Sequence, residues 1–262
     1  MSQTAQSLIQ GAHDDGDINS GSLSALANIT DIGNVIQQGL GMQVSDLQAS
    51  EVVLVTFLVD DSQSIAGAGN EQPMRDGVNG CLQALVDSKQ QDNIVVRIVY
   101  LNGTQLVPYT PLSNVPFLDT NNYRANGCTP LYDESVKTLA TIIAKTKDFE
   151  NNGIQVRTIT AICTDGQDYG SHASDASDVS TIVTDMVGTE KHIVAGIGFD
   201  NGSTDFRKIF SEMGITSNWI LTTGATADDI RRAFQVFSKS AASASKSAAH
   251  FAQTNAGGFG TP

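Results

Sequence analysis

Residues 51–64 read EVVLVTFLVDDSQS, a nearly continuous apolar run that ends in two acids and two serines. An apolar run of this length is typical of a central β-strand that is covered by helices on both faces. It is far too short to span a lipid bilayer. The polar residues that follow it are expected at the carboxyl edge of a sheet, where binding sites form in open α/β folds.

Strands and helices are predicted to alternate along the chain after this run. Asn102-Gly103 joins two β-rich segments and predicts a type I′ hairpin, and therefore one antiparallel edge strand. Apolar spacing predicts further strands at 94–101, 104–107, 154–164, 192–199 and 219–222, and helices at 74–86, 130–143, 179–187, 206–213 and 226–237. This order predicts a doubly wound α/β fold, with a mostly parallel six-stranded sheet, one antiparallel edge strand and helices on both faces.

The two ends of the chain differ in composition from the region between them. Residues 1–50 are polar and partly helical in pattern, and we expect them to form an extension that docks on a neighbouring surface. Residues 51–237 form the predicted α/β domain. Residues 238–262 are rich in Ser, Ala and Gly, a composition that predicts a flexible tail.

The chain carries 15 Lys and Arg against 28 Asp and Glu, a formal net charge of −13. This excess of acid argues against sequence-independent binding to nucleic acid and against attraction to anionic membranes. Acidic chains attract divalent cations and basic partners instead. The charge is also unevenly spread, since no Lys or Arg precedes Arg75 and every charged residue after Asp229 is basic.

The compartment is inferred from the first residues and from the cysteines. The segment Met1 to Leu8 lacks the basic and apolar regions of a secretory signal, so we expect a cytoplasmic protein. An odd number of widely spaced cysteines suggests buried thiols and not a disulfide framework. They are Cys81, Cys128 and Cys163.

Three loops that are expected to meet at the carboxyl edge of the sheet carry short oxygen side chains. Asp60, Ser62 and Ser64 follow the first strand, Thr129 precedes the helix at 130–143, and Asp165 follows the strand at 154–164. Carboxylates and hydroxyls suit a hard cation such as Mg²⁺, or Mn²⁺ or Ca²⁺ in its place. These five residues are therefore predicted to bind a metal, with room left for water or an incoming carboxylate.

The order of these five residues resembles the metal-ion-dependent adhesion site of the von Willebrand factor A (vWA) family, over about residues 51–237. The contexts Thr129-Pro130-Leu131 and Thr164-Asp165-Gly166 are similar to its bacterial cytoplasmic branch, which includes tellurite-resistance-associated proteins. The resemblance implies a vWA/Rossmann-like fold and a non-enzymatic module whose metal takes an Asp or Glu from a protein partner. It also implies a MoxR-type AAA+ ATPase, or a kinase and phosphatase system, as the partner.

Four further residues are expected to shape the partner surface around the metal: Gln63, Asp168, Tyr169 and Asp200. Two other functions remain open. The unequal charge of the two ends suggests a self-assembling structural protein, whose extensions dock on neighbouring copies in a ring or filament. Metal-assisted phosphoryl chemistry is the third reading, although the chain has no Walker A phosphate loop.

Overall fold

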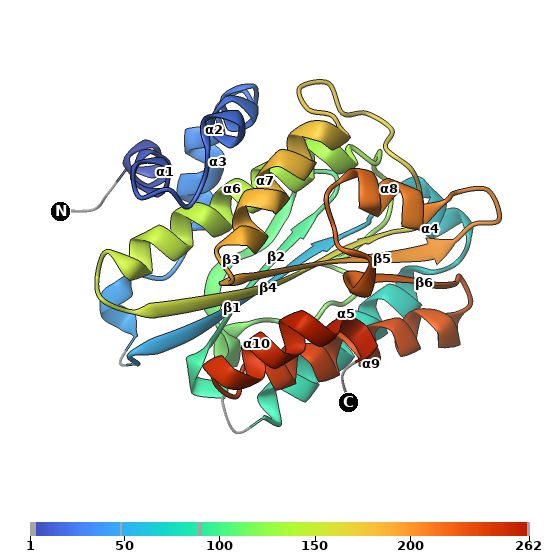
Figure 1. Ribbon diagram of the computed structural model, residues 1–262. Coiled ribbons are helices and arrows are strands. Elements are labelled where there is room, and N and C mark those ends of the chain that lie inside the picture. Colours follow the sequence, from blue (N-terminus) through green and yellow to red (C-terminus); the bar gives the residue numbers. More distant parts are fainter. Residues whose placement is uncertain (1–3, 48, 89–90, 261–262) are drawn as a thin grey trace.

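The computed structural model describes residues 4–47, 49–88 and 91–260, and their strands form one sheet between two layers of helices (Figure 1). Residues 1–3, 48 and 261–262, which belong to the two predicted extensions, lie outside the described residues. The strands are β1 (Glu51–Val59), β2 (Ile94–Tyr100), β3 (Gln105–Pro111), β4 (Gln155–Thr164), β5 (His192–Asp200) and β6 (Ile220–Gly224).

The six strands follow the order β3-β2-β1-β4-β5-β6, and only β2 and β3 pair antiparallel. The predicted fold class is therefore confirmed. β1 lies between β2 and β4, and Val59 is in register with Tyr100 on one side and Cys163 on the other. The loops after β1 and β4 consequently leave the sheet side by side.

The β2–β3 hairpin forms as predicted, but its turn is not type I′. A type I′ turn needs positive φ at both central residues. Gly103 has a φ of 84°, whereas Asn102 is absent from the positive-φ residues of the described chain. The Asn102 side chain accepts a hydrogen bond from Thr104 N–H, and the Asn102 backbone N–H donates to the Asp61 carboxylate. These contacts hold Asn102 outside the conformation that a type I′ turn needs. The register between β2 and β3 is also irregular.

Helices cover both faces of the sheet (Figure 1). On one face lie α6 (Leu131–Glu150) and α7 (Ala176–Gly188), and on the other α5 (Glu71–Val86), α9 (Ala227–Ala244) and α10 (Ala248–Gly257). Two short helices, α4 (Gln63–Gly67) and α8 (Phe206–Glu212), follow β1 and β5. Gly77 on α5 has no side chain, which allows the Phe234 ring of α9 to pack directly against it.

The N-terminal extension packs on its own chain, against α6 and α7 (Figure 1). It contains α1 (Ala5–Asp14), α2 (Ser20–Ala27) and α3 (Ile32–Gly39). Leu8 and Leu26 are buried in this contact. Asp15 and Asp17 form ion pairs with Lys147, and Asp17 also pairs with Lys191 at 3.2 Å. Part of the acidic charge at this end is therefore neutralised within one molecule.

The C-terminal segment, expected to be a flexible tail, is mostly helical over its described residues. α9 continues past the predicted end at Phe237, and α10 folds back beside it. Trp219 Nε1 donates to the Asn255 carbonyl at 3.1 Å, and its ring packs on Phe259 at 5.0 Å between centroids. Composition missed this segment because its buried residues are mainly small, such as Ala241. No helix in the described ranges is long and apolar enough to cross a bilayer.

Candidate metal centre

Asp60 is the anchor of the candidate site and is fully buried directly after β1. Its Oδ1 accepts from Ser62 N–H at 2.8 Å. Its Oδ2 accepts from the Thr164 hydroxyl at 2.6 Å and from Asp165 N–H at 3.2 Å. One carboxylate therefore binds the loop after β1 to the loop after β4.

The two serines and Asp165 form a short chain of hydrogen bonds. The Ser64 hydroxyl donates to Asp165 Oδ1 at 2.6 Å. The hydroxyl oxygens of Ser62 and Ser64 lie 2.8 Å apart. Since the single hydroxyl hydrogen of Ser64 goes to Asp165, Ser62 is the donor between the serines. Three predicted ligands from two loops thus lie in direct contact.

Thr129 comes from a third loop and is also buried. It exchanges two backbone hydrogen bonds with Tyr169, at 3.0 and 2.8 Å. Its Oγ1 lies 3.9 Å from the position that a Cβ on Gly166 would occupy, next to Asp165. The Thr129 hydroxyl has no hydrogen bond to the serines among the described contacts, but its loop borders theirs, because Gln63 N–H donates to the Gly127 carbonyl at 3.0 Å.

Burial changes the acidity of two carboxyl groups here. Desolvation raises the pKa of Asp165 to about 6; the Ser64 hydrogen bond opposes this shift, and the charge of Asp60 adds to it. Desolvation raises the pKa of Asp61 to about 7, against a hydrogen bond from Asn102 and with the repulsion of Asp60. Asp61 Oδ2 is buried without a hydrogen-bond partner in the described structure. The site therefore concentrates negative charge that a cation would relieve.

The donor set fits a hard divalent cation. Two carboxylates and three hydroxyls supply only oxygen, which Mg²⁺ and Ca²⁺ prefer over nitrogen and sulfur. The described residues contain no group of three or more His, Cys, Asp or Glu that could hold a metal. The candidate metal centre rests instead on the two carboxylates and three hydroxyls described above.

The four residues predicted to shape the partner surface lie at this edge of the sheet, with different surroundings: Gln63 begins α4, Asp200 ends β5, and Asp168 and Tyr169 lie on the loop after β4. Gln63 is exposed between the serines, and Tyr169 is 74% exposed beside Thr129. Asp168 turns to the start of α6, accepting from Ser171 Oγ at 2.6 Å and Tyr132 N–H at 3.2 Å. Asp200 accepts from Gly202 N–H at 2.7 Å, and its loop reaches the site through Asn201.

Several contributors were not predicted from the sequence. Thr164 holds Asp60, and its position before Asp165 was a usable signal. Asn201 donates to the Asp165 carbonyl at 2.8 Å, and Tyr123 OH donates to the Asp60 carbonyl; no sequence pattern announces these long-range contacts. Cys128, expected to be buried, is exposed, whereas Cys81 and Cys163 are buried thiols as predicted.

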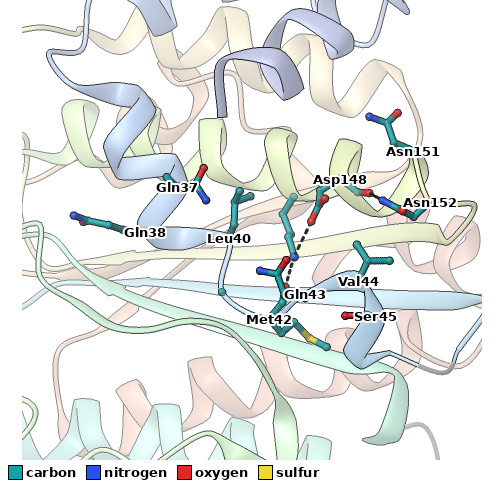
Figure 2. Close-up of a pocket in the computed structure, with 12 residues that line it drawn as sticks. Gln37, Gln38, Leu40, Met42, Gln43, Val44, Ser45, Asp148, Asn151 and Asn152 are labelled. Atoms are coloured by element: carbon teal, nitrogen blue, oxygen red, sulfur yellow. Dashed lines mark hydrogen bonds and ion pairs between the residues drawn. The ribbon is translucent and has the colours of Figure 1, made fainter. Parts of the chain in front are cut away.

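A polar cleft of about 590 Å³ lies elsewhere, between the end of α3, the following turn (Val44–Asp46) and the end of α6 (Figure 2). Lys145 is buried in it and donates to the Met42 carbonyl at 2.7 Å and to Asp148 at 3.0 Å. No predicted site residue lines this cleft. We interpret the Lys145 contacts as an attachment of the N-terminal extension to α6.

Comparison with known proteins shows structural likeness to solved structures. No protein-family model matches the chain, and no curated protein matches it. The pilus adhesin SpaC from Lactobacillus rhamnosus GG matches with a TM-score of 0.57 at 13% identity, over 75% of this chain and 31% of that one. Proximal thread matrix protein 1 from the mussel byssus matches with a TM-score of 0.51 at 16% identity, over 73% and 46%.

A second structure of the mussel protein, described as having a zinc-occupied MIDAS motif, matches with a TM-score of 0.50 at 15% identity, over 73% of this chain and 46% of that one. This chain therefore spans less than half the length of these solved proteins. At such low identity the likeness concerns the fold. The chain has a mostly parallel, doubly wound α/β fold of the vWA/Rossmann-like type.

Proposed function

We propose that this chain is a cytoplasmic, non-enzymatic module that binds protein partners through a divalent cation, Mg²⁺ or a cation like it. Its ligands would be Asp60, Ser62, Ser64, Thr129 and Asp165. The bound cation would supply a positive charge that can take one more oxygen ligand from outside the chain.

The single observation that carries this proposal is the contact of Ser62, Ser64 and Asp165, held by Asp60 through three hydrogen bonds. Residues more than a hundred positions apart bring only oxygen atoms together at the carboxyl edge of the sheet, where ligands bind in this fold class. Buried carboxylates that are not matched by Lys or Arg favour a cation there.

The protein's own residues would orient the site and select its partner. Asp60 fixes both loops, and Thr129 is fixed by its backbone pairing with Tyr169. The exposed rim residues Gln63 and Tyr169, with Asp168 and Asp200, would contact the protein that supplies an Asp or Glu. The ligands include no histidine, the commonest general base, which favours a static bridge over catalysis.

Affinity capture tests the proposal. Immobilised protein is exposed to a lysate with Mg²⁺ or with EDTA, and in parallel with the variant Asp165→Asn. We expect one set of proteins retained only by the unaltered chain in Mg²⁺; a MoxR-type AAA+ ATPase, or a kinase and phosphatase pair, would match the partners that the bacterial vWA resemblance implies. Identical capture in all conditions would contradict the proposal.

A further inference from the structure

We infer that one partner of the metal centre is a second copy of this chain, which supplies the carboxylate of Glu190 from the opposite edge of its sheet. This inference rests on the proposed function, since it names the partner of the same site. Glu190 lies in the turn between α7 and β5, at the amino edge, whereas the metal ligands follow the carboxyl ends of β1 and β4. The contact would therefore join copies head to tail.

Glu190 has the properties that an external metal ligand needs. It is exposed, and its carboxylate has no hydrogen bond or ion pair to the described residues. The adjacent cation, Lys191, is already shared by Glu150 at 2.8 Å and Asp17 at 3.2 Å. The charge of Glu190 is thus left available for a cation outside its own molecule.

The backbone at Glu190 is also unusual. Its φ is 59°, and only Asp31 shares a positive φ among the described residues other than glycine. A left-handed conformation is unfavourable for a residue with a side chain, and glycine would adopt it freely. Keeping glutamate at this position is consistent with a functional use of its side chain.

A hollow beside Glu190 provides a second point of contact. It has a volume of about 590 Å³ and a mainly apolar lining. Its walls include the apolar residues Val156, Val187, Phe251 and Ala252. Asn218 and Asn255 line it as well, and charged side chains, among them Arg157 and Lys191, also contribute to its lining. A hollow with this mixture suits an aromatic ring that carries a polar tip.

The metal edge carries the matching feature. Tyr169 is the more exposed of the two large exposed hydrophobic residues in the described chain, and its backbone pairs with the ligand Thr129. One edge therefore presents a cation site beside an aromatic ring, and the other presents a free carboxylate beside a hollow. The bound cation would pair with the Glu190 carboxylate, and the Tyr169 ring would enter the hollow. These two matching contacts favour a second copy of the chain as the partner of the metal centre. Because the two patches lie on opposite edges, repeated contacts would form a ring or filament.

Size-exclusion chromatography with light scattering, at several protein concentrations with Mg²⁺ or EDTA, tests the inference. The unaltered chain should gain mass in Mg²⁺ and return to a monomer in EDTA. Glu190→Gln should weaken assembly by roughly 30-fold or more, the effect of losing one member of a close charge pair. Tyr169→Ala should weaken it as well, whereas Glu212→Gln, an exposed glutamate on α8, should behave like the unaltered chain.

Calorimetric titration of the same samples with Mg²⁺ separates this inference from the proposed function. A chain that binds Mg²⁺ but stays monomeric at every concentration overturns the inference and leaves the metal module intact. A chain that binds no Mg²⁺ overturns the proposed function itself. Assembly that survives Glu190→Gln but is lost in Asp31→Asn, the other exposed acid with a positive φ, also overturns the role of Glu190.

Discussion

The Ser64 hydroxyl donates a 2.6 Å hydrogen bond to the Asp165 carboxylate, joining two loops that are 101 residues apart in the sequence. Both side chains are candidate metal ligands, so this bond holds them close before a cation arrives. A site that is assembled in advance loses little conformational freedom on binding.

Ser64→Ala should therefore weaken Mg²⁺ binding by roughly 10- to 100-fold, because it removes a ligand and frees Asp165. Isothermal titration calorimetry measures the change. Ser113→Ala, at an exposed serine remote in sequence from the candidate ligands, is the matched control and should bind Mg²⁺ as the unaltered chain does. Equal affinities for both variants would remove Ser64 from the site.

The raised pKa values of Asp61 and Asp165 predict how stability depends on pH. Their native values of about 7 and about 6 lie above the ordinary 3.8, so the native state holds more protons than the unfolded state across that interval. The free energy of unfolding of the metal-free protein should consequently fall as pH rises from about 4 to about 7 through these two groups.

Mg²⁺ should reverse this loss at neutral pH. At a hundred times its dissociation constant a ligand stabilises the native state by about 2.7 kcal/mol. We expect most of this gain at neutral pH and little of it below the pKa of Asp165, where a proton competes with the cation. Urea unfolding at both ends of the range measures the gain. Asp165→Asn should show no stabilisation by Mg²⁺ at either end, although the pH dependence due to Asp61 remains. A Mg²⁺ effect that is equal at both ends would contradict this explanation.

Gly41 lies where the N-terminal extension contacts β3, and a side chain at this position should destabilise the fold. Its φ is 60°, and a Cβ at this position would overlap the Tyr109 backbone, to which Met42 N–H donates at 2.8 Å. Gly41→Ala should lower the free energy of unfolding by about 2 kcal/mol through strain and overpacking. Gly33→Ala is the control, because its Cβ meets no atom within 4 Å and its φ is not positive. Thermal unfolding that ranks Gly33→Ala as the less stable variant would contradict this account.

Glu190→Gly should make the fold more stable by up to about 1 kcal/mol, because glycine relieves the left-handed backbone. The same change should abolish Mg²⁺-dependent assembly. Chemical denaturation and light scattering on one preparation test both effects. Lower stability would show that the Glu190 side chain supports its own fold.

The sequence predicted the sheet well because the run 52–59 is almost continuously apolar and because turn residues separate the strands. It also brought Asp60, Ser62, Ser64, Thr129 and Asp165 into one prediction, since loops after neighbouring parallel strands share an edge. The structure brings the loops that carry these residues together.

Other features depend on contacts that periodicity does not encode. The Asn102-Gly103 turn departs from type I′ because Asp61 binds Asn102 N–H. The helices of the N-terminal extension are held by partners distant in sequence, as when Asp185 accepts from the Ser22 hydroxyl at 2.6 Å. The small residues of α9 and α10 resemble a linker in composition, although Trp219 and Phe259 hold the segment in place.

The most direct test of the metal centre is a Mg²⁺ titration of the unaltered chain and of Asp165→Asn, with circular dichroism to establish that both are folded. The proposed site predicts one Mg²⁺ bound per chain and no measurable binding to the folded variant. No binding by the unaltered chain, or equal binding by both proteins, would contradict it.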